Sequence, residues 1–329
     1  MKKFKKIIRA VLVLAVLAGL IYLIPKVITV VRLKRAADSY VAASSVSTFK
    51  DSKTTIIYDT NDQELCTMKN TKDMYYVSYQ EIPVTLVNSF VVMEDRQFYK
   101  HSGYDIKAIL RAIVINQKSN DIAQGASTIT QQLARNIFLS QEVTWQRKVE
   151  EIFIAVGLEK KYSKNQILEF YLNNIYFGNG YYGVEAAARG YFDKSVSELT
   201  LAEQTFIAAI PNNPTRYNPL TNYDNTVQRK NLILQQLYEA DDIGSLDRYM
   251  AETEEVVLNP HQTEEINNSV VTYARHCATE SLMSVSGFTF RYNFSSEDDY
   301  NAYEATYDTF YNMCQQKLLS GGYSIYTSI

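Results

Sequence analysis

The chain opens on a long apolar run that follows a cluster of basic residues. Five basic residues lie within the first nine positions, and residues 10–25 are then uncharged. After Lys26 the apolar pattern continues through residues 27–31. A helix over residues 7–31 would be about 37 Å long at ~1.5 Å per residue, which is enough to span a bilayer with some tilt. The pattern therefore predicts a transmembrane anchor.

The charges that flank this run predict its orientation. The cationic N-terminus should stay in the cytoplasm, so we expect a cytoplasmic tail over residues 1–6, an anchor over 7–31 and an extracytoplasmic stem over 32–54. The alternative is a signal peptide cleaved near Ala42–Ala43. Basic residues rather than a small-residue cleavage site flank the run, and this favours the anchor.

Beyond the stem, the pattern changes from alternating to helical. Residues 55–68 are rich in β-branched residues around Asn61–Asp62, which predicts a short hairpin. From Val84 onward the apolar spacing is helical, and capping boxes at 163–166 and 200–203 mark two helix starts. The residues expected to face inward are Ile167, Leu168, Tyr171 and Leu172 on one helix, and Val149, Ile152, Phe153 and Val156 on another. The pattern predicts a mainly α-helical domain over residues 55–240.

Residues 241–329 have a different composition. They contain four basic and fourteen acidic residues, and their last nine positions read as a turn that leads into a strand. We expect a linker followed by the start of a further, truncated domain.

Composition and charge exclude some classes of function. The hydrophobic fraction of 46% and only six prolines predict an ordered, compact protein. Residues 1–35 hold nine basic and no acidic residues, whereas the remainder holds 24 basic and 36 acidic ones. An acidic body does not fit a nucleic-acid partner. Cys277 and Cys314 could form a disulfide outside the cell, but free thiols fit equally well, and no cysteine spacing is typical of a metal site.

Five polar blocks carry the candidate chemistry. Two separated carboxylates, Glu94 and Glu151, lie among clustered cations, hydroxyls and amides. Taken singly, each block has an ordinary explanation, such as a helix cap or an i, i+4 ion pair on a solvated face. All five in this order are much harder to explain in that way. The blocks are Glu94–Gly103, Gly125–Gln132, Arg147–Glu151, Lys164–Asn173 and Arg229–Leu234.

These five blocks resemble the five motifs of the peptidoglycan glycosyltransferases of family 51. That domain is shared by monofunctional transglycosylases and class A penicillin-binding proteins. The resemblance covers roughly residues 55–237. It implies a lysozyme-like helical domain with a smaller membrane-proximal jaw.

The resemblance also implies roles for individual residues. Glu94 matches the general base that takes the proton from the acceptor's 4-hydroxyl. Glu151 matches the second essential glutamate, which helps to hold the donor pyrophosphate directly or through a divalent Mg²⁺ or Mn²⁺; no organic cofactor is implied. Arg135 stands where many relatives have lysine, which keeps the charge but changes the geometry. The residues expected to bind substrate are Asp95, His101, Ser127, Thr130, Gln131, Gln132, Arg135, Arg147, Lys148, Glu169, Asn173 and Arg229.

Physical chemistry supports the transferase interpretation. A pyrophosphate is a good leaving group, so neutralising its charge with Arg and Lys matters more than protonating it. A glycosidase instead needs a carboxylic acid for its sugar leaving group and no cation cluster. A single displacement of an α-linked pyrophosphate inverts the configuration. The implied partners are lipid II, the nascent glycan strand, the membrane and other cell-wall synthesis proteins, with no nucleic acid.

The sequence leaves open the role of one apolar run and three alternative functions: a bifunctional enzyme, a glycan hydrolase and a non-catalytic scaffold. The apolar run Ile109–Ile115 fits either core packing or a lip that dips into the membrane. Residues 322–329 resemble the strand that opens a transpeptidase domain, so we expect a fragment of a bifunctional parent. The single Ser-x-x-Lys, Ser47–Lys50, has no Lys-[Ser/Thr]-Gly partner and is interpreted as coincidence. A glycan hydrolase and a non-catalytic scaffold remain rival functions. The cation-rich motifs disfavour the hydrolase, and the retained carboxylates disfavour the scaffold.

Overall fold

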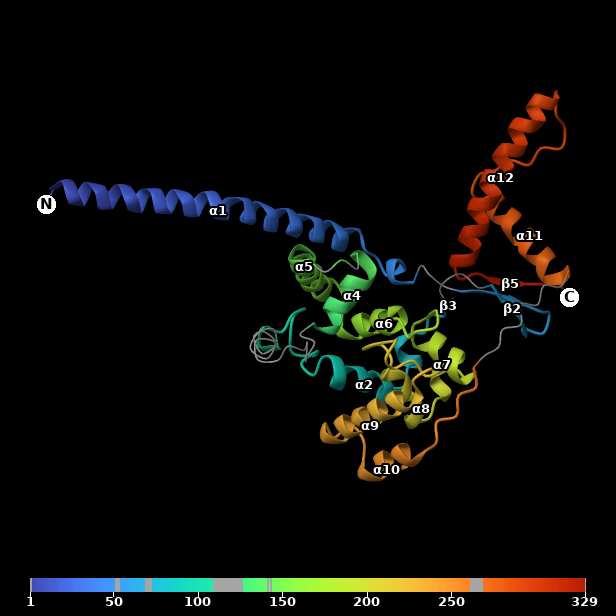
Figure 1. The fold of residues 1–329 in the computed structure, drawn as a ribbon. Coiled ribbons are helices and arrows are strands. Elements are labelled where there is room, and N and C mark those ends of the chain that lie inside the picture. The colour runs from blue at the N-terminus through green and yellow to red at the C-terminus, as the bar shows by residue number, and fades with distance from the viewer. Residues whose placement is uncertain are drawn as a thin grey trace. The chain divides into compact units, whose positions relative to one another are not determined.

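The protein is mainly helical, as the sequence predicts (Figure 1). A computed structural model describes residues 2–50, 54–68, 73–108, 127–140, 142, 144–260 and 269–328, and of residues 2–21, 73 and 320 it describes the backbone only. Two compact units alternate along the chain. Unit 1 comprises residues 1–44 and 97–167, and unit 2 comprises residues 45–96 and 168–329.

Unit 1 is built around one helix, α5, which packs against both α1 and α4. The chain enters α4 through a capping box in which Thr128 accepts from the amide of Gln131. Thr144 caps α5 in the same way, accepting from the amide of Arg147 at 3.2 Å. The helices of this unit are α1 (Lys2–Ala43), α4 (Ile129–Phe138), α5 (Trp145–Lys161) and the first turn of α6 (Lys164–Asn174).

The end of α1 is fastened to the C-terminal half of α5. Gly157 allows the close approach, because a Cβ at this position would lie 2.7 Å from Cγ2 of Val41. Lys161 Nζ donates to the carbonyl of Val41 at 2.8 Å, satisfying a carbonyl that has no partner within the helix. The hydroxyls of Ser44 and Tyr162 are 3.0 Å apart. These contacts hold the C-terminal end of α1 against α5.

The predicted anchor over residues 7–31 lies inside α1, which continues as one helix to Ala43. In the described part of the chain, no helix combines the length and the apolar character that a membrane span requires. The anchor therefore stays a prediction.

The predicted buried face of α5 is wrong in register. Val149, Ile152, Phe153 and Val156 are only half-buried. The fully buried residues of α5 are Glu151, Ile154, Ala155 and Leu158. Two features of α5 explain the difference. It packs against both α1 and α4, so burial is not limited to one apolar stripe, and its most buried face includes a glutamate, which hydrophobic periodicity does not place inward.

Unit 2 has a helical core in which α2 packs on α8 and α9, and α10 packs on α9. Phe90 of α2 contacts Tyr171 and Phe177 edge to face, at ring-centroid distances of 5.9 and 6.2 Å. The capping box at Thr200–Glu203 is confirmed, as is the burial of Ile167, Leu168, Tyr171 and Leu172. These helices are α2 (Val84–Glu94), α8 (Leu201–Ala208), α9 (Tyr223–Glu239) and α10 (Ser245–Thr253), and α7 (Val184–Phe192) contacts α8.

The strands of unit 2 include the predicted hairpin. β1 (Thr55–Tyr58) pairs antiparallel with β2 (Glu64–Met68), and β5 (Ser324–Tyr326) pairs parallel with β1. Asp59 shapes the turn by accepting from the amides of Asn61 and Gln63 at 2.7 and 2.8 Å. A separate two-stranded sheet joins β3 (Asp73–Met74) and β4 (Tyr181–Tyr182) in parallel.

The last two helices pack on this hairpin. α11 (Ser269–Val285) and α12 (Glu297–Ser320) lie side by side (Figure 1), and a small core of Ile57, Met68, Val271 and Leu318 joins them to β1 and β2. All three cysteines are free thiols, so the disulfide that the sequence left open is not formed.

The Ser-x-x-Lys segment has a packing role. Ser47–Phe49 forms a 3-10 turn, and the Phe49 ring stacks on Phe170 at 4.1 Å. Asn174 Nδ2 donates to the carbonyl of Phe49 at 3.0 Å, and Lys50 Nζ lies 4.4 Å from the centre of the Tyr76 ring. The segment thus packs through Phe49 and Lys50, and its interpretation as a coincidence stays a prediction.

Candidate active site

In unit 2, Glu94 is the last residue of α2, and α9 brings Arg229 next to it. Arg229 Nη2 lies 3.7 Å from Glu94 Oε1. The guanidinium also lies over the ring of Tyr217, 5.0 Å from its centre, which fixes its orientation. The Glu94 side chain is 18% exposed, so a solvent-borne hydroxyl can reach it. The first and fifth polar blocks thus meet, although they are far apart in the sequence.

In unit 1, Glu151 forms the centre of a cation cluster. Its side chain is only 1% exposed, and Arg147 Nη1 lies 3.2 Å from Oε2. Lys148 Nζ pairs with Oε1 of the same carboxylate and donates to the Ser127 hydroxyl at 2.7 Å. A carboxylate this deep in the protein needs such charged partners. The second and third polar blocks are therefore joined, with Glu151 holding two cations in place.

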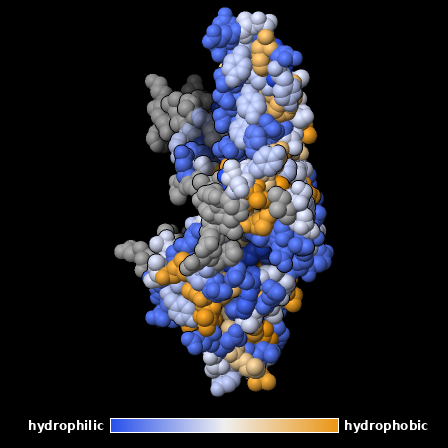
Figure 2. All heavy atoms as spheres, turned by 90° about the vertical axis from the view of Figure 1, so that its right-hand side faces the viewer, coloured by the Kyte–Doolittle hydropathy of each residue, from blue (hydrophilic) through white to orange (hydrophobic). Residues whose placement is uncertain are grey.

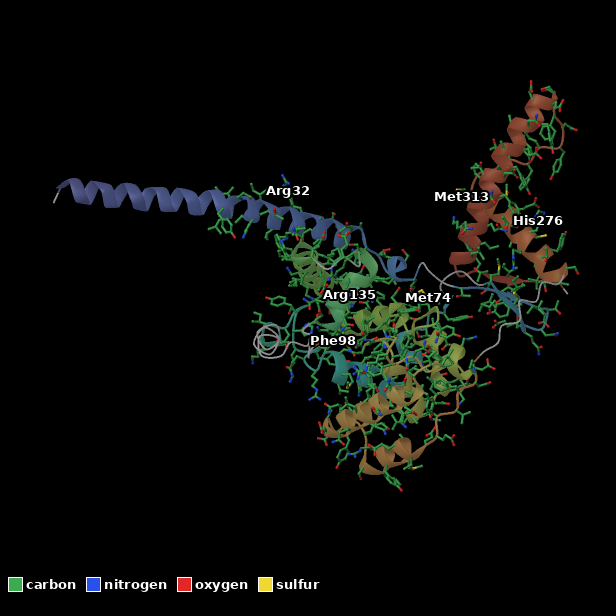
Figure 3. The ribbon with its side chains drawn as sticks, in the orientation of Figure 1. Arg32, Met74, Phe98, Arg135, His276 and Met313 are labelled. Atoms are coloured by element: carbon green, nitrogen blue, oxygen red, sulfur yellow. The ribbon has the colours of Figure 1, made fainter. Side chains whose placement is uncertain are left out.

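Two donors among the predicted site residues of unit 1 have no partner in the described part of the chain. They are Nε of Arg147 and Nε2 of Gln131, both buried. An unsatisfied buried donor costs on the order of 1–3 kcal/mol. A ligand rich in acceptor oxygens, such as a phosphate, could satisfy them. Arg135 lies on α4 of the same unit (Figure 3).

Glu159 connects three of the polar blocks, and the sequence does not mark it. Thr130 donates to its Oε1 at 2.6 Å, and Lys164 Nζ lies 2.7 Å from the same oxygen. His101 Nδ1 is 3.8 Å away, and Lys164 also donates to the His101 carbonyl at 2.9 Å. In the sequence, Glu159 is one of several charged residues near the end of α5. Only the structure, in which its side chain is 5% exposed, shows that it links these blocks. The Thr130 hydroxyl is thereby engaged within the protein.

Glu169 and Asn173 of the fourth block hold the segment that precedes α2. Glu169 accepts from the Tyr76 hydroxyl at 2.6 Å and from the amide of Tyr79 at 3.1 Å. Burial and the adjacent Glu169 carboxylate raise the pKa of Tyr76, so this hydroxyl stays a donor. The Asn173 side chain donates to the carbonyl of Val77 and accepts from its amide, both at 2.9 Å. These contacts give both residues a structural role, and substrate binding by them stays a prediction.

Comparison with known proteins assigns the family. A family model described as Transglycosylase matches residues 61–238. The chain belongs to the transglycosylase family. Penicillin-binding protein 4 of Bacillus subtilis (strain 168) is 43% identical over 212 residues, which are 64% of this chain and 34% of that protein. Penicillin-binding protein 1A of Escherichia coli (strain K12) is 42% identical over 222 residues, or 67% and 26%.

This transglycosylase spans about a quarter to a third of the length of these relatives. A third relative, penicillin-binding protein 1A of Aquifex aeolicus (strain VF5), is 43% identical over 198 residues, covering 60% of this chain and 25% of the relative. A crystal structure of penicillin-binding protein 1A from Haemophilus influenzae superposes with a TM-score of 0.40 and 18% identity, over 84% of this chain and 26% of that one. That likeness is too low to define a shared fold.

The remaining predicted site residues of the transglycosylase are placed as follows. Asp95 caps α2 and is 8% exposed, and Gln132 is half-buried on α4. The start of the second block, Gly125–Ala126, and the apolar run Ile109–Ile115 lie outside the described residues.

The described residues do not fit a metal site of the protein's own. They contain no group of three His, Cys, Asp or Glu side chains that could hold an ion. Both oxygens of Glu151 already face cations, Arg147 and Lys148. The donor set is thus suited to an anion, and the role of Mg²⁺ or Mn²⁺ stays a prediction from the family resemblance.

Proposed function

We propose that this transglycosylase polymerises lipid II into β-1,4-linked glycan strands. The observation that carries the proposal is the cluster in which Glu151 holds Arg147 and Lys148 while Lys148 also binds Ser127. It is a preorganised set of positive charge and donors, which is what a departing pyrophosphate needs. The membership in the transglycosylase family supports the same reaction.

Glu94 is the proposed base. Its carboxylate takes the proton from the acceptor's 4-hydroxyl, and that oxygen forms a bond to C1 of the donor sugar. The bond between C1 and the pyrophosphate oxygen breaks on the opposite face, so the configuration inverts and undecaprenyl pyrophosphate leaves with its electron pair. Arg229 supports this role by holding the carboxylate at the end of α2, 3.7 Å from its guanidinium.

Arg147 and Lys148 are the proposed pyrophosphate ligands, together with Arg135 of α4 in the same unit. Glu151 acts through these cations: at 1% exposure it sets their geometry and compensates their charge before the substrate arrives. The unsatisfied donors of Arg147 and Gln131 add hydrogen bonds for phosphate oxygens. The two glutamates therefore have different tasks, one at the acceptor hydroxyl and one behind the leaving group.

The proposed setting is the outer face of the cytoplasmic membrane. Residues 7–31 would anchor the protein so that the sugar head of a lipid-linked donor enters the site while its lipid stays in the bilayer. We also propose that the chain is the N-terminal part of a bifunctional class A penicillin-binding protein, in keeping with the family of its relatives. The nascent glycan and other cell-wall synthesis proteins are the proposed partners.

One assay tests the reaction and separates it from its main rival. Purified protein is incubated with labelled lipid II in detergent, and the products are resolved by gel electrophoresis and mass spectrometry. We expect a ladder of glycan polymer together with undecaprenyl pyrophosphate. Shortening of added glycan without polymer from lipid II would instead identify a hydrolase, and no change in either substrate would identify a scaffold.

A further inference from the structure

A cavity of about 690 Å³ opens between α11, α12 and the chain that connects them. None of its lining residues belongs to the five polar blocks of the transglycosylase site. The upper end of the molecule in Figure 2 includes this part of the chain. The face shown there is mostly hydrophilic (blue to white), with scattered hydrophobic residues. Figure 3 places His276 on α11 and Met313 on α12, the two helices concerned.

Three carboxylates line this cavity from two helices. Glu304 and Asp308 are four residues apart on α12 and so share one face, while Glu280 comes from α11. Among the described residues that line the cavity there is no lysine or arginine. The closest arginine in sequence, Arg291, is engaged by Asp299 at 2.8 Å. His276 Nε2 lies 3.6 Å from Glu280 Oε2, whereas the described lining itself brings no lysine or arginine to Glu304 and Asp308.

Tyrosine hydroxyls orient two of the three carboxylates. Tyr307 donates to Glu280 Oε1 at 3.1 Å, and Tyr300 donates to Glu304 Oε1 at 3.2 Å. Burial and the Glu280 carboxylate raise the pKa of Tyr307 to about 12, so the hydroxyl is a neutral donor at physiological pH. Each hydrogen bond uses one lone pair and leaves the carboxylate able to accept further N–H donors.

Aromatic rings form the rest of the wall. The ring of Tyr307 lies 6.4 Å from that of Phe290 and 6.3 Å from that of Tyr303, at interplanar angles of 67° and 38°. Ring faces attract ammonium groups and also pack against methylene chains. Acidic oxygens and aromatic faces thus meet in one cavity, and a ligand that satisfies both must be cationic and partly apolar.

We propose that this cavity binds a linear aliphatic diamine through its two primary ammonium groups. Carboxylates on two opposing helices suit a dication, since one ammonium can bind at Glu280 while the other binds at Glu304 and Asp308. Primary ammonium groups provide the N–H donors that these oxygens accept. The rings of Tyr303, Tyr307 and Phe290 would enclose the connecting methylenes. This binding site is independent of the proposed glycosyl transfer.

Isothermal titration calorimetry with 1,5-diaminopentane at low ionic strength tests the site. We expect saturable binding of one molecule per chain, and binding of the uncharged 1,5-pentanediol that is weaker by about tenfold or more. Glu304→Gln combined with Asp308→Asn should weaken diamine binding by about tenfold or more. Glu297→Gln combined with Asp298→Asn is the matched control, because it removes the same charge from exposed residues of α12 outside the cavity. Circular dichroism verifies that both variants are folded.

Three results would each overturn the proposal. One is the absence of saturable diamine binding to the wild-type chain. Another is equal binding of pentanediol, which would leave the carboxylates without a role. The third is equal loss of binding in the cavity variant and in the control, which would show that net charge alone attracts the diamine.

Discussion

The hydroxyl of Thr130 donates a 2.6 Å hydrogen bond to Oε1 of Glu159, and both side chains are buried. The same oxygen accepts a hydrogen bond from Lys164 Nζ at 2.7 Å. One carboxylate oxygen therefore links α4 to the start of α6. Burial of a carboxylate costs free energy unless charged and hydrogen-bonding partners compensate it, as Lys164 and Thr130 do here. Glu159 therefore supports the geometry of unit 1 on which the cation cluster depends.

Replacing Glu159 by Gln should lower the free energy of unfolding by about 1–3 kcal/mol. The amide keeps the size of the side chain but loses the charge that Lys164 pairs with. Chemical denaturation followed by circular dichroism measures the effect. Glu255→Gln, which alters an exposed glutamate, serves as the control and should change stability by less than about 0.5 kcal/mol. Equal stability of the two variants would show that the Glu159 network does not stabilise the fold.

Glu94→Gln should slow lipid II polymerisation by about 10²–10⁴-fold, the range attributable to a general base. Its thermal unfolding midpoint should stay close to that of the wild type, because Glu94 is partly exposed and its contact with Arg229 is long, at 3.7 Å. Initial rates of glycan formation provide the measurement. A wild-type rate in this variant would remove the base assignment.

Glu151→Gln should reduce kcat/KM for lipid II by about 10²-fold or more, because Arg147 and Lys148 lose the charge that orients them. The neighbouring Glu150→Gln is the matched control: Glu150 is half-buried and lies outside the cation cluster, so its variant should keep most of the activity at neutral pH. The comparison fails to support our assignment if both variants lose activity to the same extent.

Glu150 also predicts a pH effect on stability. Burial raises the pKa of its carboxyl above the ordinary value of 4.5, so the folded state binds this proton more tightly than the unfolded state does. The resulting stabilisation is fully present below pH 4.5 and is lost as the pH rises through the folded-state pKa. The Glu150→Gln variant should lack this dependence. Unfolding free energies of both proteins from about pH 4 to pH 7 test it, and identical pH profiles would contradict it.

Gly103→Ala should destabilise unit 1 by about 2 kcal/mol or more. Gly103 has φ +102, and an added Cβ would meet the backbone of Ala155 and Val156 at 2.8 Å. Gly287→Ala separates the two causes, since Gly287 also has positive φ (+91) but has nothing within 4 Å of the added atom. Thermal melts should show the larger loss for Gly103→Ala. A similar loss in both variants would assign the whole cost to backbone conformation.

Much of the local structure follows from the sequence because its causes are local. The hairpin turn at Asn61–Asp62, the capping box at Thr200–Glu203 and the inward face of Ile167–Leu172 depend on residues close in the chain. The family is recognisable for a related reason: its five motifs are short blocks in a set order, and the family match over residues 61–238 agrees with them.

The tertiary structure alone decided which polar residues meet and which face of each helix is deepest. Periodicity places the apolar residues Val149 and Phe153 inward, but the buried face of α5 carries Glu151, because Arg147 and Lys148 compensate its charge. Hydrophobic spacing cannot anticipate this, since burial of a charge depends on partners brought by other elements. The contacts of Glu159 with Thr130 and Lys164, and the cavity between α11 and α12, also depend on residues that are distant in the chain. Both can therefore be recognised only in the tertiary structure.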